Sequence, residues 1–509
     1  MEKVFEQITK VNNVINDFVW VKIGLILLIG AGILMTCATK FFQIGHIGHW
    51  WKETIGSVFK KDSEATKKTD KKTISQFQAL CTALAATIGT GNIAGVSAAI
   101  VIGGPGAVFW MWVAAFFGMM TNYSENVLGI YYRRRNKDGE WSGGAMYYLK
   151  DGLGSYKHCK KAGSILAALF SVFAILASFG IGNMGQINKI TLNMQSAFFK
   201  NIDLGQVAGI PIVNIIIGVV LMIIAALIII GGLQRIAAVA EKIVPFMAIF
   251  YCVGALIVFF MNINSIGAVF TSIFKFAFGI KAVAGGAAGI AISQVITQGC
   301  KRGVFSNEAG LGSSVMVHSS SNVKEPVLQG MWGIFEVFFD SFVVCTMTAV
   351  VVLSSGYINL ETGLPLEGVN DATLVSQAFG NAFGPIGEMF VAVAMLLFAF
   401  TTVLGWSQYG TKAVEYLFGG KGVKVYKVIF VIMIISGAVM TSSLAWDISD
   451  TFNGLMMIPN LIGVVSLMPL VAKITNNYVS RRLKGKQEEP MYSFNKDIQE
   501  EVAAAPENE

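Results

Sequence analysis

Long apolar runs, separated by short polar stretches, fill most of this chain. Several reach the ~20 residues that an α-helix needs to cross the hydrocarbon core of a bilayer. Reading the runs against Gly, Pro and charged residues predicts eleven membrane-spanning helices. They lie at about 19–39, 76–103, 106–132, 162–183, 209–232, 243–262, 283–300, 326–354, 386–407, 428–445 and 451–472. The expected fold class is an all-α integral membrane protein.

The second of these runs contains a predicted break. Gly89, Gly91 and Gly95 fall within nine residues that also include Thr87, Thr90 and Asn92. Each glycine weakens a helix by about 0.8–1 kcal/mol relative to alanine. Broken backbone at membrane depth is tolerated only where it is buried in protein or lines a watery cavity. The pattern therefore predicts a polar site inside the membrane.

Composition agrees with a polytopic membrane protein. The chain of 509 residues is 54% hydrophobic and 14% charged, with a mean hydropathy of +0.62, whereas soluble domains carry about 25% charged residues. The six cysteines show neither zinc-site nor disulfide spacing. The net charge of +7 does not indicate nucleic-acid binding, because the basic residues gather in particular loops.

The distribution of Lys and Arg predicts the orientation. With the N-terminus outside, 31 of the 38 basic residues fall in cytoplasmic segments, and the loop at 355–385 has none. The positive-inside rule therefore favours an external N-terminus and a cytoplasmic C-terminus. We expect an extracellular segment at 1–18, a transporter domain at 19–476 and a disordered cytoplasmic tail at 477–509. The expected location is a prokaryotic plasma or inner membrane.

A second glycine-rich break is predicted at 299–312, five helices after the first. An odd number of crossings reverses the chain direction, so helices 2–6 and 7–11 would form an inverted 5+5 repeat, with core repeats at about 76–262 and 283–472. One extra helix precedes them. Inverted repeats with broken first helices place a transport site at the bilayer midplane.

The motifs at 89–95 (GTGNIAG), 103–106 (GGPG) and 303–313 (GVFSNEAGLGS) resemble the alanine or glycine:cation symporter family, which has the leucine-transporter fold. The resemblance runs from about residue 15 to 475. It implies symport of small neutral amino acids, alanine or glycine, with sodium and in some members with protons. No cofactor beyond the coupling ion is expected. One departure is Asn122, where the family leads us to expect a basic residue.

An amino acid needs donors for its carboxylate and acceptors for its ammonium group. Freed N–H groups at the first break can supply the donors, unless Gly91 and Gly95 only form a helix-packing face. Phe305 and Ser306 in the second break would close the pocket from the other repeat, unless Phe305 is ordinary core packing. Trp406 would set the pocket size, unless it belongs to an interfacial aromatic belt. On helix 4, two amides three residues apart mark either the pocket wall or an interhelical hydrogen bond. The candidate substrate residues are Gly89, Thr90, Gly91, Asn92, Asn183, Gln186, Phe305, Ser306 and Trp406.

Sodium prefers oxygen ligands, as other hard cations do. In the superfamily that the resemblance implies, adjacent hydroxyl residues on the eighth core helix meet the first core helix at a sodium site. Those positions match Thr401 and Thr402, with carbonyls near Ala86, Thr87 and Gly89 completing the shell. The alternative is that the two hydroxyls bond only to their own helix.

Glu125, Glu308, Glu336 and Asp340 are acidic residues in or beside the predicted helices. The partner of Glu125 is open, and Glu308 either holds the broken backbone or touches the ligand. Glu336 and Asp340 are four residues apart and are expected to face one way, in a proton-linked role or in buried hydrogen bonding.

Two other classes of function fit the sequence less well. The segment Thr87–Gly91 is superficially similar to a potassium-channel filter, but it lies in a full spanning length rather than a re-entrant loop. An enzyme would need a nucleophile or metal constellation, and none of the four His residues lies in a helix centre with an acidic partner. The expected partners are a small neutral amino acid, sodium and the lipid bilayer, with the oligomeric state left open.

Overall fold

The computed structural model describes residues 2–60, 63–67, 72–278, 291–371, 373–440 and 444–504. The first part of the predicted helix at 283–300, the last residues of the helix at 428–445 and the end of the tail at 505–509 lie outside these ranges. In the described part the protein is mostly helical, as the sequence predicted.

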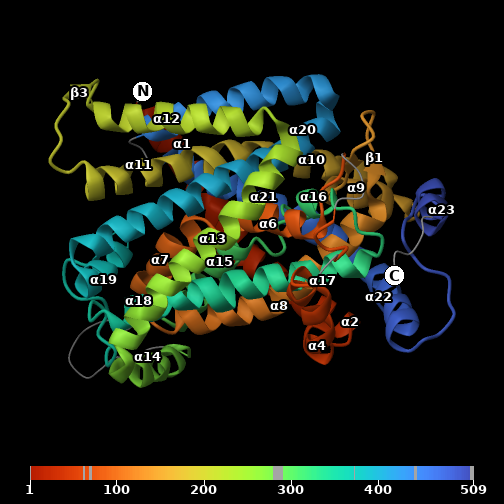
Figure 1. Ribbon diagram of the computed structural model, residues 1–509, viewed down its shortest axis with the longest axis horizontal. Helices are drawn as coiled ribbons and strands as arrows, with labels where there is room; N and C mark the ends of the chain where they lie inside the picture. Colours follow the sequence, from red (N-terminus) through yellow and green to blue (C-terminus); the bar gives the residue numbers. More distant parts are fainter. Residues whose placement is uncertain are drawn as a thin grey trace.

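The elements follow one another along the chain as a series of helices with two short hairpins (Figure 1), and η marks π-helical or 3-10 segments. The first half contains α1 Glu2–Asp17, η1 Phe18–Gly24, α2 Leu25–Ala38, α3 Phe42–Gly45, α4 Ile47–Glu53, α5 Ile55–Val58, α6 Gln76–Thr87, η2 Gly91–Gly95, α7 Val96–Gly103, α8 Ala107–Tyr132, β1 Arg134–Arg135, β2 Trp141–Ser142, α9 Ala145–Tyr147, η3 Tyr148–Gly152, η4 Leu153–Ser155, α10 Lys160–Phe179, η5 Gly180–Met184, α11 Gly185–Phe198, β3 Gln206–Val207, β4 Ile210–Pro211, α12 Ile212–Ile229 and α13 Gly232–Met261. The second half contains α14 Ile263–Phe276, α15 Ile292–Asn307, α16 Val315–His318, α17 Pro326–Val337, η6 Phe338–Cys345, α18 Thr346–Ser354, α19 Leu374–Phe383, α20 Pro385–Val439, α21 Leu444–Ser466, α22 Met468–Tyr478, η7 Val479–Leu483 and α23 Lys496–Ala504.

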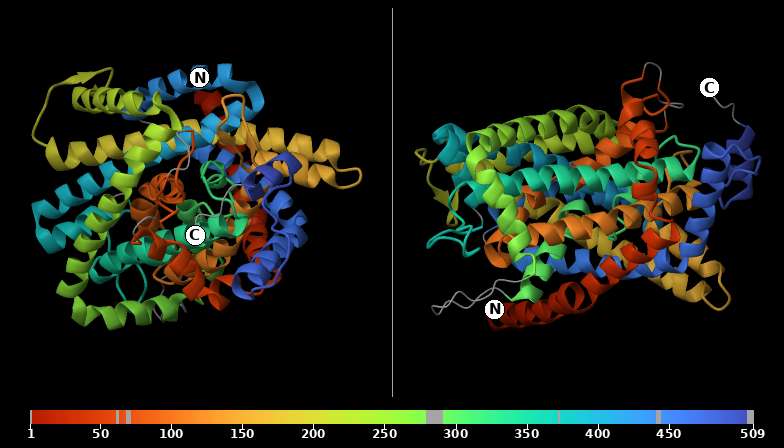
Figure 2. Two further views of the ribbon diagram at one scale, coloured as in Figure 1. Left: turned by 45° about the vertical axis from the view of Figure 1, so that its right-hand side comes forward. Right: turned by 90° about the horizontal axis from the view of Figure 1, so that it is seen from below.

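The long helices form one bundle (Figures 1 and 2). Figure 1 shows β3, α14 and α19 at one end of this bundle and β1, α9 and α23 at the other. Among the described residues, seven helices are long and apolar enough to cross a membrane, or eight if the bent pair α6–α7 counts as one span. The predicted helix at 386–407 lies within α20, and the one at 428–445 begins in α20 and runs past its end at Val439. The two parts of α20 meet at Gly419, which has a non-helical conformation (φ 69°, ψ −170°).

The break predicted in the second apolar run is confirmed. Helix α6 begins with a capping box, in which the Ser75 hydroxyl accepts a hydrogen bond from the Gln78 N–H and the Gln78 side chain accepts one from the Ser75 N–H. The helix ends at Thr87, because Ile88 takes an extended ψ of 92°. The chain resumes at Gly91 with its axis turned by 53°.

The second break begins later than predicted. Helix α15 continues to Asn307, so the glycines at 299 and 303 lie within regular helix. The helix stops at Glu308, which has a left-handed backbone (φ 54°, ψ 9°), and Gly310 and Gly312 follow with φ values of 92° and 73°. Phe305 and Ser306 therefore belong to the last turn of α15 and not to the broken segment.

The tail was expected to lack structure, and residues 477–504 instead contain η7 and α23. Arg481 makes two hydrogen bonds to the Glu325 carboxylate, at 2.8 and 2.9 Å. The Phe494 N–H donates to the Tyr131 carbonyl at 2.9 Å. Polar composition suggested disorder, but these residues are held by groups at the ends of α17 and α8.

Candidate functional site

A small cavity lies where the breaks after α6 and α15 face each other. Helices α20 and α21 and the η5 segment complete its wall. Its volume is about 20 Å³, room for about one water molecule. The residues that line it are Ala86, Thr87, Gly89, Gly91, Ile181, Gln186, Phe305, Glu308, Thr402, Trp406 and Asn453.

The backbone of the first break lies close to α15 and α20 at this point. A Cβ atom added to Gly91 would lie 3.2 Å from Phe305 Cδ1 and 3.4 Å from Ser306 Cα. A Cβ atom on Gly89 would lie 2.5 Å from the Thr402 hydroxyl oxygen. A methyl group at Gly89 would therefore force the Thr402 side chain to shift, whereas one at Gly91 would require Phe305 to move by only a few tenths of an ångström.

Side-chain amides hold the freed backbone of the first break. The Gly89 N–H donates to Asn92 Oδ1 at 2.9 Å, and the Thr90 N–H donates to Gln186 Oε1 at 3.4 Å. Asn92 is buried and does not line the cavity. Its side chain therefore stabilises the turn rather than facing the cavity.

The two adjacent threonines of α20 face in different directions. The Thr402 hydroxyl is 2.9 Å from the Phe398 carbonyl oxygen and 3.4 Å from that of Ile88, at the end of α6. The Thr401 hydroxyl lies 2.9 Å from the carbonyl oxygens of Leu397 and Phe398 on its own helix, and it faces Met247. Thr402 is thus at the first break, whereas Thr401 is not; the expectation that both side chains meet the break is wrong for Thr401.

The amides of helix 4 also separate. Gln186 lines the cavity, and its Nε2 donates to the Ile181 carbonyl at 3.0 Å. Asn183 instead donates to the Phe430 carbonyl at 2.7 Å and does not line the cavity. Between them, the π-helical segment η5 ends at Met184. This change of helical pitch removes the shared face that a regular helix would give.

Trp406 forms one wall of the cavity. Its side chain packs against the backbone of η5, so that a Cβ atom on Gly182 would lie 2.5 Å from the Trp406 Cβ and Cγ atoms. Its ring contacts that of Tyr409 edge to face, at a centroid distance of 5.3 Å. The size of the cavity on this side therefore depends on how closely the Trp406 side chain packs against Gly182.

Asp340 lies directly behind the first break. Its carboxylate accepts hydrogen bonds from Asn92 Nδ2 at 2.6 Å, from the Ser306 hydroxyl at 2.9 and 3.1 Å, and from the Ser341 hydroxyl at 3.0 Å. This carboxylate joins η2, α15 and η6. Ser306 is consequently used to hold Asp340 and does not line the cavity.

The remaining intramembrane carboxylates have separate partners. Glu308 lines the cavity and accepts a hydrogen bond from the Ser313 hydroxyl at 2.5 Å. Glu125 accepts one from Asn460 at 2.5 Å. Glu336 lies 2.9 Å from His318 Nε2. Glu336 and Asp340 are both buried, and they make hydrogen bonds with different groups. The π-helical segment η6 begins between them, at Phe338.

Sequence reasoning missed two residues of the wall, Ile181 and Asn453. Ile181 looks like ordinary packing in the sequence, and its carbonyl accepts the Gln186 hydrogen bond. Asn453 is a polar residue within an apolar helix, and such residues often mark a functional site, so the sequence did contain a signal for it. Its Oδ1 and the Thr87 hydroxyl are buried acceptors with no hydrogen-bond partner among the described residues.

The chain was compared with known families and proteins. The model of the "Sodium:alanine symporter family" matches residues 5–492. The sodium/alanine symporter AgcS of Methanococcus maripaludis is 42% identical over 466 residues, covering 92% of this chain and 96% of that protein. The probable sodium/glutamine symporter GlnT of Bacillus subtilis is 34% identical over 500 residues, covering 98% and 95%. A crystal structure of MhsT in complex with L-phenylalanine is 14% identical, with a TM-score of 0.48, and the match covers 80% of this chain and 99% of that one. Because the family model matches nearly the whole chain and the relatives align over most of their length, the chain belongs to the sodium:alanine symporter family and is a multi-pass membrane transporter.

Proposed function

We propose that this protein imports small neutral amino acids, alanine or glycine, together with sodium. The observation that carries the proposal is the cavity between the two breaks, because it brings together backbone donors, unpartnered oxygen acceptors and the Thr402 hydroxyl.

The substrate carboxylate would bind the backbone of the first break. The Thr90 N–H makes only a 3.4 Å contact with Gln186 Oε1, near the upper limit for a hydrogen bond. A carboxylate can replace this contact and gain a charge-assisted bond. The ammonium group would be taken by the Asn453 Oδ1 acceptor and the Glu308 carboxylate on the opposite wall.

The side chain of the substrate would lie between Phe305 and Trp406. Both line a cavity of about 20 Å³, which must widen before any amino acid can enter. Each added methylene increases the required movement, so alanine and glycine fit better than glutamine. Asn92, Asn183, Ser306 and Thr401 are not part of the proposed site and serve to hold its framework.

Sodium would bind between α6 and α20. A hydroxyl has one proton, and that of Thr402 is used at 2.9 Å on Phe398, so its lone pairs face the Ile88 carbonyl oxygen 3.4 Å away. An ion placed ~2.4 Å from each of two oxygens at this separation would see them at about a right angle. Such distances and angles are typical of a hard cation bound by oxygen ligands. The unpartnered Thr87 hydroxyl and the Ala86 segment supply further oxygens.

The proposed architecture is the eleven-span arrangement with an inverted 5+5 repeat, an external N-terminus and a cytoplasmic C-terminus. The proposed orientation is supported by the positions of β1, α9 and α23, which lie together at one end of the bundle (Figure 1). These elements lie in segments rich in Lys and Arg, which favour the cytoplasmic side. Sodium would stiffen the first break, the amino acid would bind beside it, and the two repeats would rock about the filled site. One sodium ion moved through 100 mV releases about 2.3 kcal/mol, enough for a substrate gradient of roughly 50-fold.

The test is uptake of radiolabelled alanine into proteoliposomes under an inward sodium gradient or an inward proton gradient. We expect accumulation with sodium, and competition by unlabelled glycine that is stronger than competition by glutamine. Uptake that needs only the proton gradient would contradict the sodium site. Stronger competition by glutamine than by alanine would contradict the proposed substrate.

A further inference from the structure

A pocket outside the transport cavity has a volume of about 730 Å³. It is formed by the β1–β2 hairpin loop, the turn between α12 and α13, and the parts of α20 on both sides of Gly419. These segments lie at the end of the bundle that holds β1, α9 and α23 (Figure 1). Neither the family match nor the transport cycle assigns a role to this pocket.

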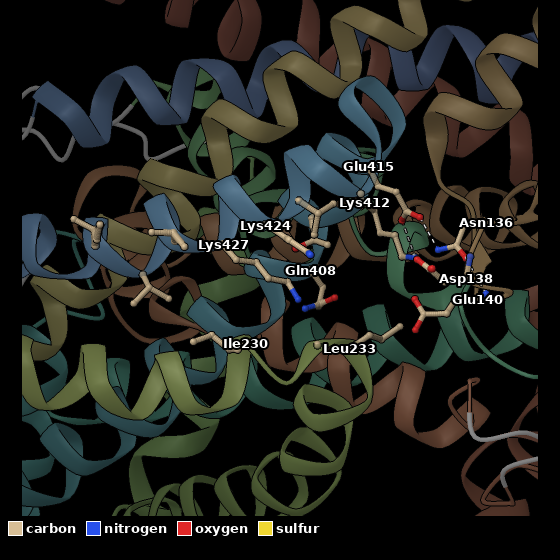
Figure 3. Close-up of a pocket in the computed structure, with 17 residues that line it drawn as sticks. Asn136, Asp138, Glu140, Ile230, Leu233, Gln408, Lys412, Glu415, Lys424 and Lys427 are labelled. Carbon is tan, nitrogen blue, oxygen red and sulfur yellow. Dashed lines mark hydrogen bonds and ion pairs between the residues drawn. The ribbon is translucent and has the colours of Figure 1, made fainter.

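One end of the pocket is charged (Figure 3). Lys412 and Glu415 form an ion pair at 3.2 Å, and Lys412 also donates to the Trp141 carbonyl at 3.0 Å, so their charges cancel. Lys424 and Lys427 also line the pocket, and neither has a hydrogen-bond or ion-pair partner within the residues that the structure describes.

Two acidic side chains face these lysines. Asp138 and Glu140, on the hairpin loop, line the same charged end (Figure 3). With the Lys412 pair neutralised, two ammonium groups and two carboxylates remain among the lining residues, and the Lys72 ammonium outside the lining donates to the Asp138 backbone carbonyl at 2.6 Å. A ligand that matches them carries both a negative and a positive group, because a purely anionic ligand would be repelled by the acidic pair.

The other end of the pocket is apolar and continues onto the surface of the bundle. Ile230, Val428 and Ile432 line it and are 71%, 60% and 56% exposed. In a membrane protein such side chains face the acyl chains of lipids. The pocket thus joins a charged region to the hydrocarbon, as the headgroup boundary of a bilayer does.

A buried donor lies between the two ends. Gln408 is 2% exposed, lies beside Lys427 in the pocket (Figure 3), and its Nε2 has no hydrogen-bond partner among the described residues. A buried N–H group without an acceptor is costly. A phosphate oxygen held by Lys424 and Lys427 would supply that acceptor.

We propose that this pocket binds an aminophospholipid, with its phosphate at Lys424 and Lys427, its ammonium group at Asp138 and Glu140, and its acyl chains along Ile230, Val428 and Ile432. Phosphatidylethanolamine has this combination of groups. The pocket is too large for a small free amino acid, and its opening onto the apolar surface provides for the acyl chains. The lipid would connect the α12–α13 turn to the second part of α20.

The experiment is native mass spectrometry of the delipidated full-length protein in detergent, with phosphatidylethanolamine, phosphatidylglycerol or glycerophosphoethanolamine added at equal concentration. We expect the highest occupancy with phosphatidylethanolamine, and little with the soluble headgroup. Replacing Asp138→Asn and Glu140→Gln together should lower phosphatidylethanolamine binding by about two- to five-fold and leave phosphatidylglycerol binding equal or higher. Lys424→Ala with Lys427→Ala should lower the binding of both lipids.

The matched control is Lys421→Ala, because Lys421 is on the same helix and exposed but does not line the pocket. It should bind as the unmodified protein does. Thermal unfolding of each variant checks that the fold is kept. The proposal is overturned if phosphatidylglycerol binds the unmodified protein as well as phosphatidylethanolamine, if the soluble headgroup binds equally, or if Lys421→Ala has the effect of the double lysine variant.

Discussion

The two adjacent threonines of α20 offer a sharp test of the proposed sodium site. Thr402→Val removes one oxygen at nearly constant side-chain volume. In the structure that hydroxyl lies 2.9 Å from the Phe398 carbonyl oxygen, the nearer acceptor, and 3.4 Å from the Ile88 carbonyl oxygen. Thr401→Val is the matched control, since its hydroxyl bonds within its own helix and faces Met247.

The expected magnitude follows from the interaction lost. A hydrogen-bond-type contact to a charged group contributes about 1.5–3 kcal/mol, and each 1.4 kcal/mol changes an equilibrium constant about tenfold. Thr402→Val should therefore raise the half-saturating sodium concentration by about 10- to 150-fold. Thr401→Val loses only a neutral intrahelical bond, which costs about 0.5–1.5 kcal/mol of stability, and should leave the sodium dependence unchanged.

The assay is the initial rate of radiolabelled alanine uptake into proteoliposomes, measured over a series of sodium concentrations with equal amounts of folded protein. Lithium or choline replaces sodium to hold the ionic strength. If Thr401→Val shifts the sodium dependence as far as Thr402→Val, the assignment from side-chain direction is wrong. An unchanged sodium dependence in Thr402→Val would refute the site itself.

Three further substitutions test the framework of the cavity. Asp340→Asn replaces charge-assisted hydrogen bonds from three side chains by neutral ones. The affinity for alanine, measured by binding to the purified protein, should therefore fall by roughly tenfold or more. Unchanged affinity would mean that the carboxylate does not organise the break. Gly182→Ala puts a methyl group 2.5 Å from the Trp406 side chain, so that side chain must shift. If it shifts into the cavity, the KM for alanine should rise more than the KM for glycine. Equal changes in the two KM values would argue against Trp406 as a determinant of substrate size. Arg481→Ala leaves the Glu325 carboxylate, 4% exposed, without its two hydrogen bonds; the melting temperature should fall and limited proteolysis should cut first near the C-terminus, and an unchanged cleavage pattern would contradict the docking of the tail.

Part of the site could be predicted from local sequence. Three glycines with Thr and Asn neighbours inside an apolar run of spanning length fixed the position of the first break, because hydrocarbon tolerates free backbone groups only around a buried site. The same reasoning placed the second break too early. Its glycines at 299 and 303 are in helical backbone, whereas Gly310 and Gly312 have the positive φ values that break it.

The direction of single side chains could not be predicted. Thr401 and Thr402 are neighbours, and about 100° of helical rotation decides which of them meets α6. Asn183 and Gln186 should share a face in a regular helix, but η5 changes the pitch between them. Nothing in the local sequence showed that Ser306 and Asn92 would be used to hold Asp340.

The sequence by itself determined the membrane environment, most of the helices, the first break and the family, because these depend on apolar length, glycine content and a contiguous motif. Tertiary structure alone decided which polar groups are already satisfied and which remain free. Hydrogen bonds between η2, α15 and η6 use Asn92, Ser306 and Asp340, while the Thr87 hydroxyl and the Asn453 side-chain oxygen have no partner in the described residues. A buried polar group can bind a ligand only if its bonding capacity is not used by the protein, and that depends on neighbours distant in the chain.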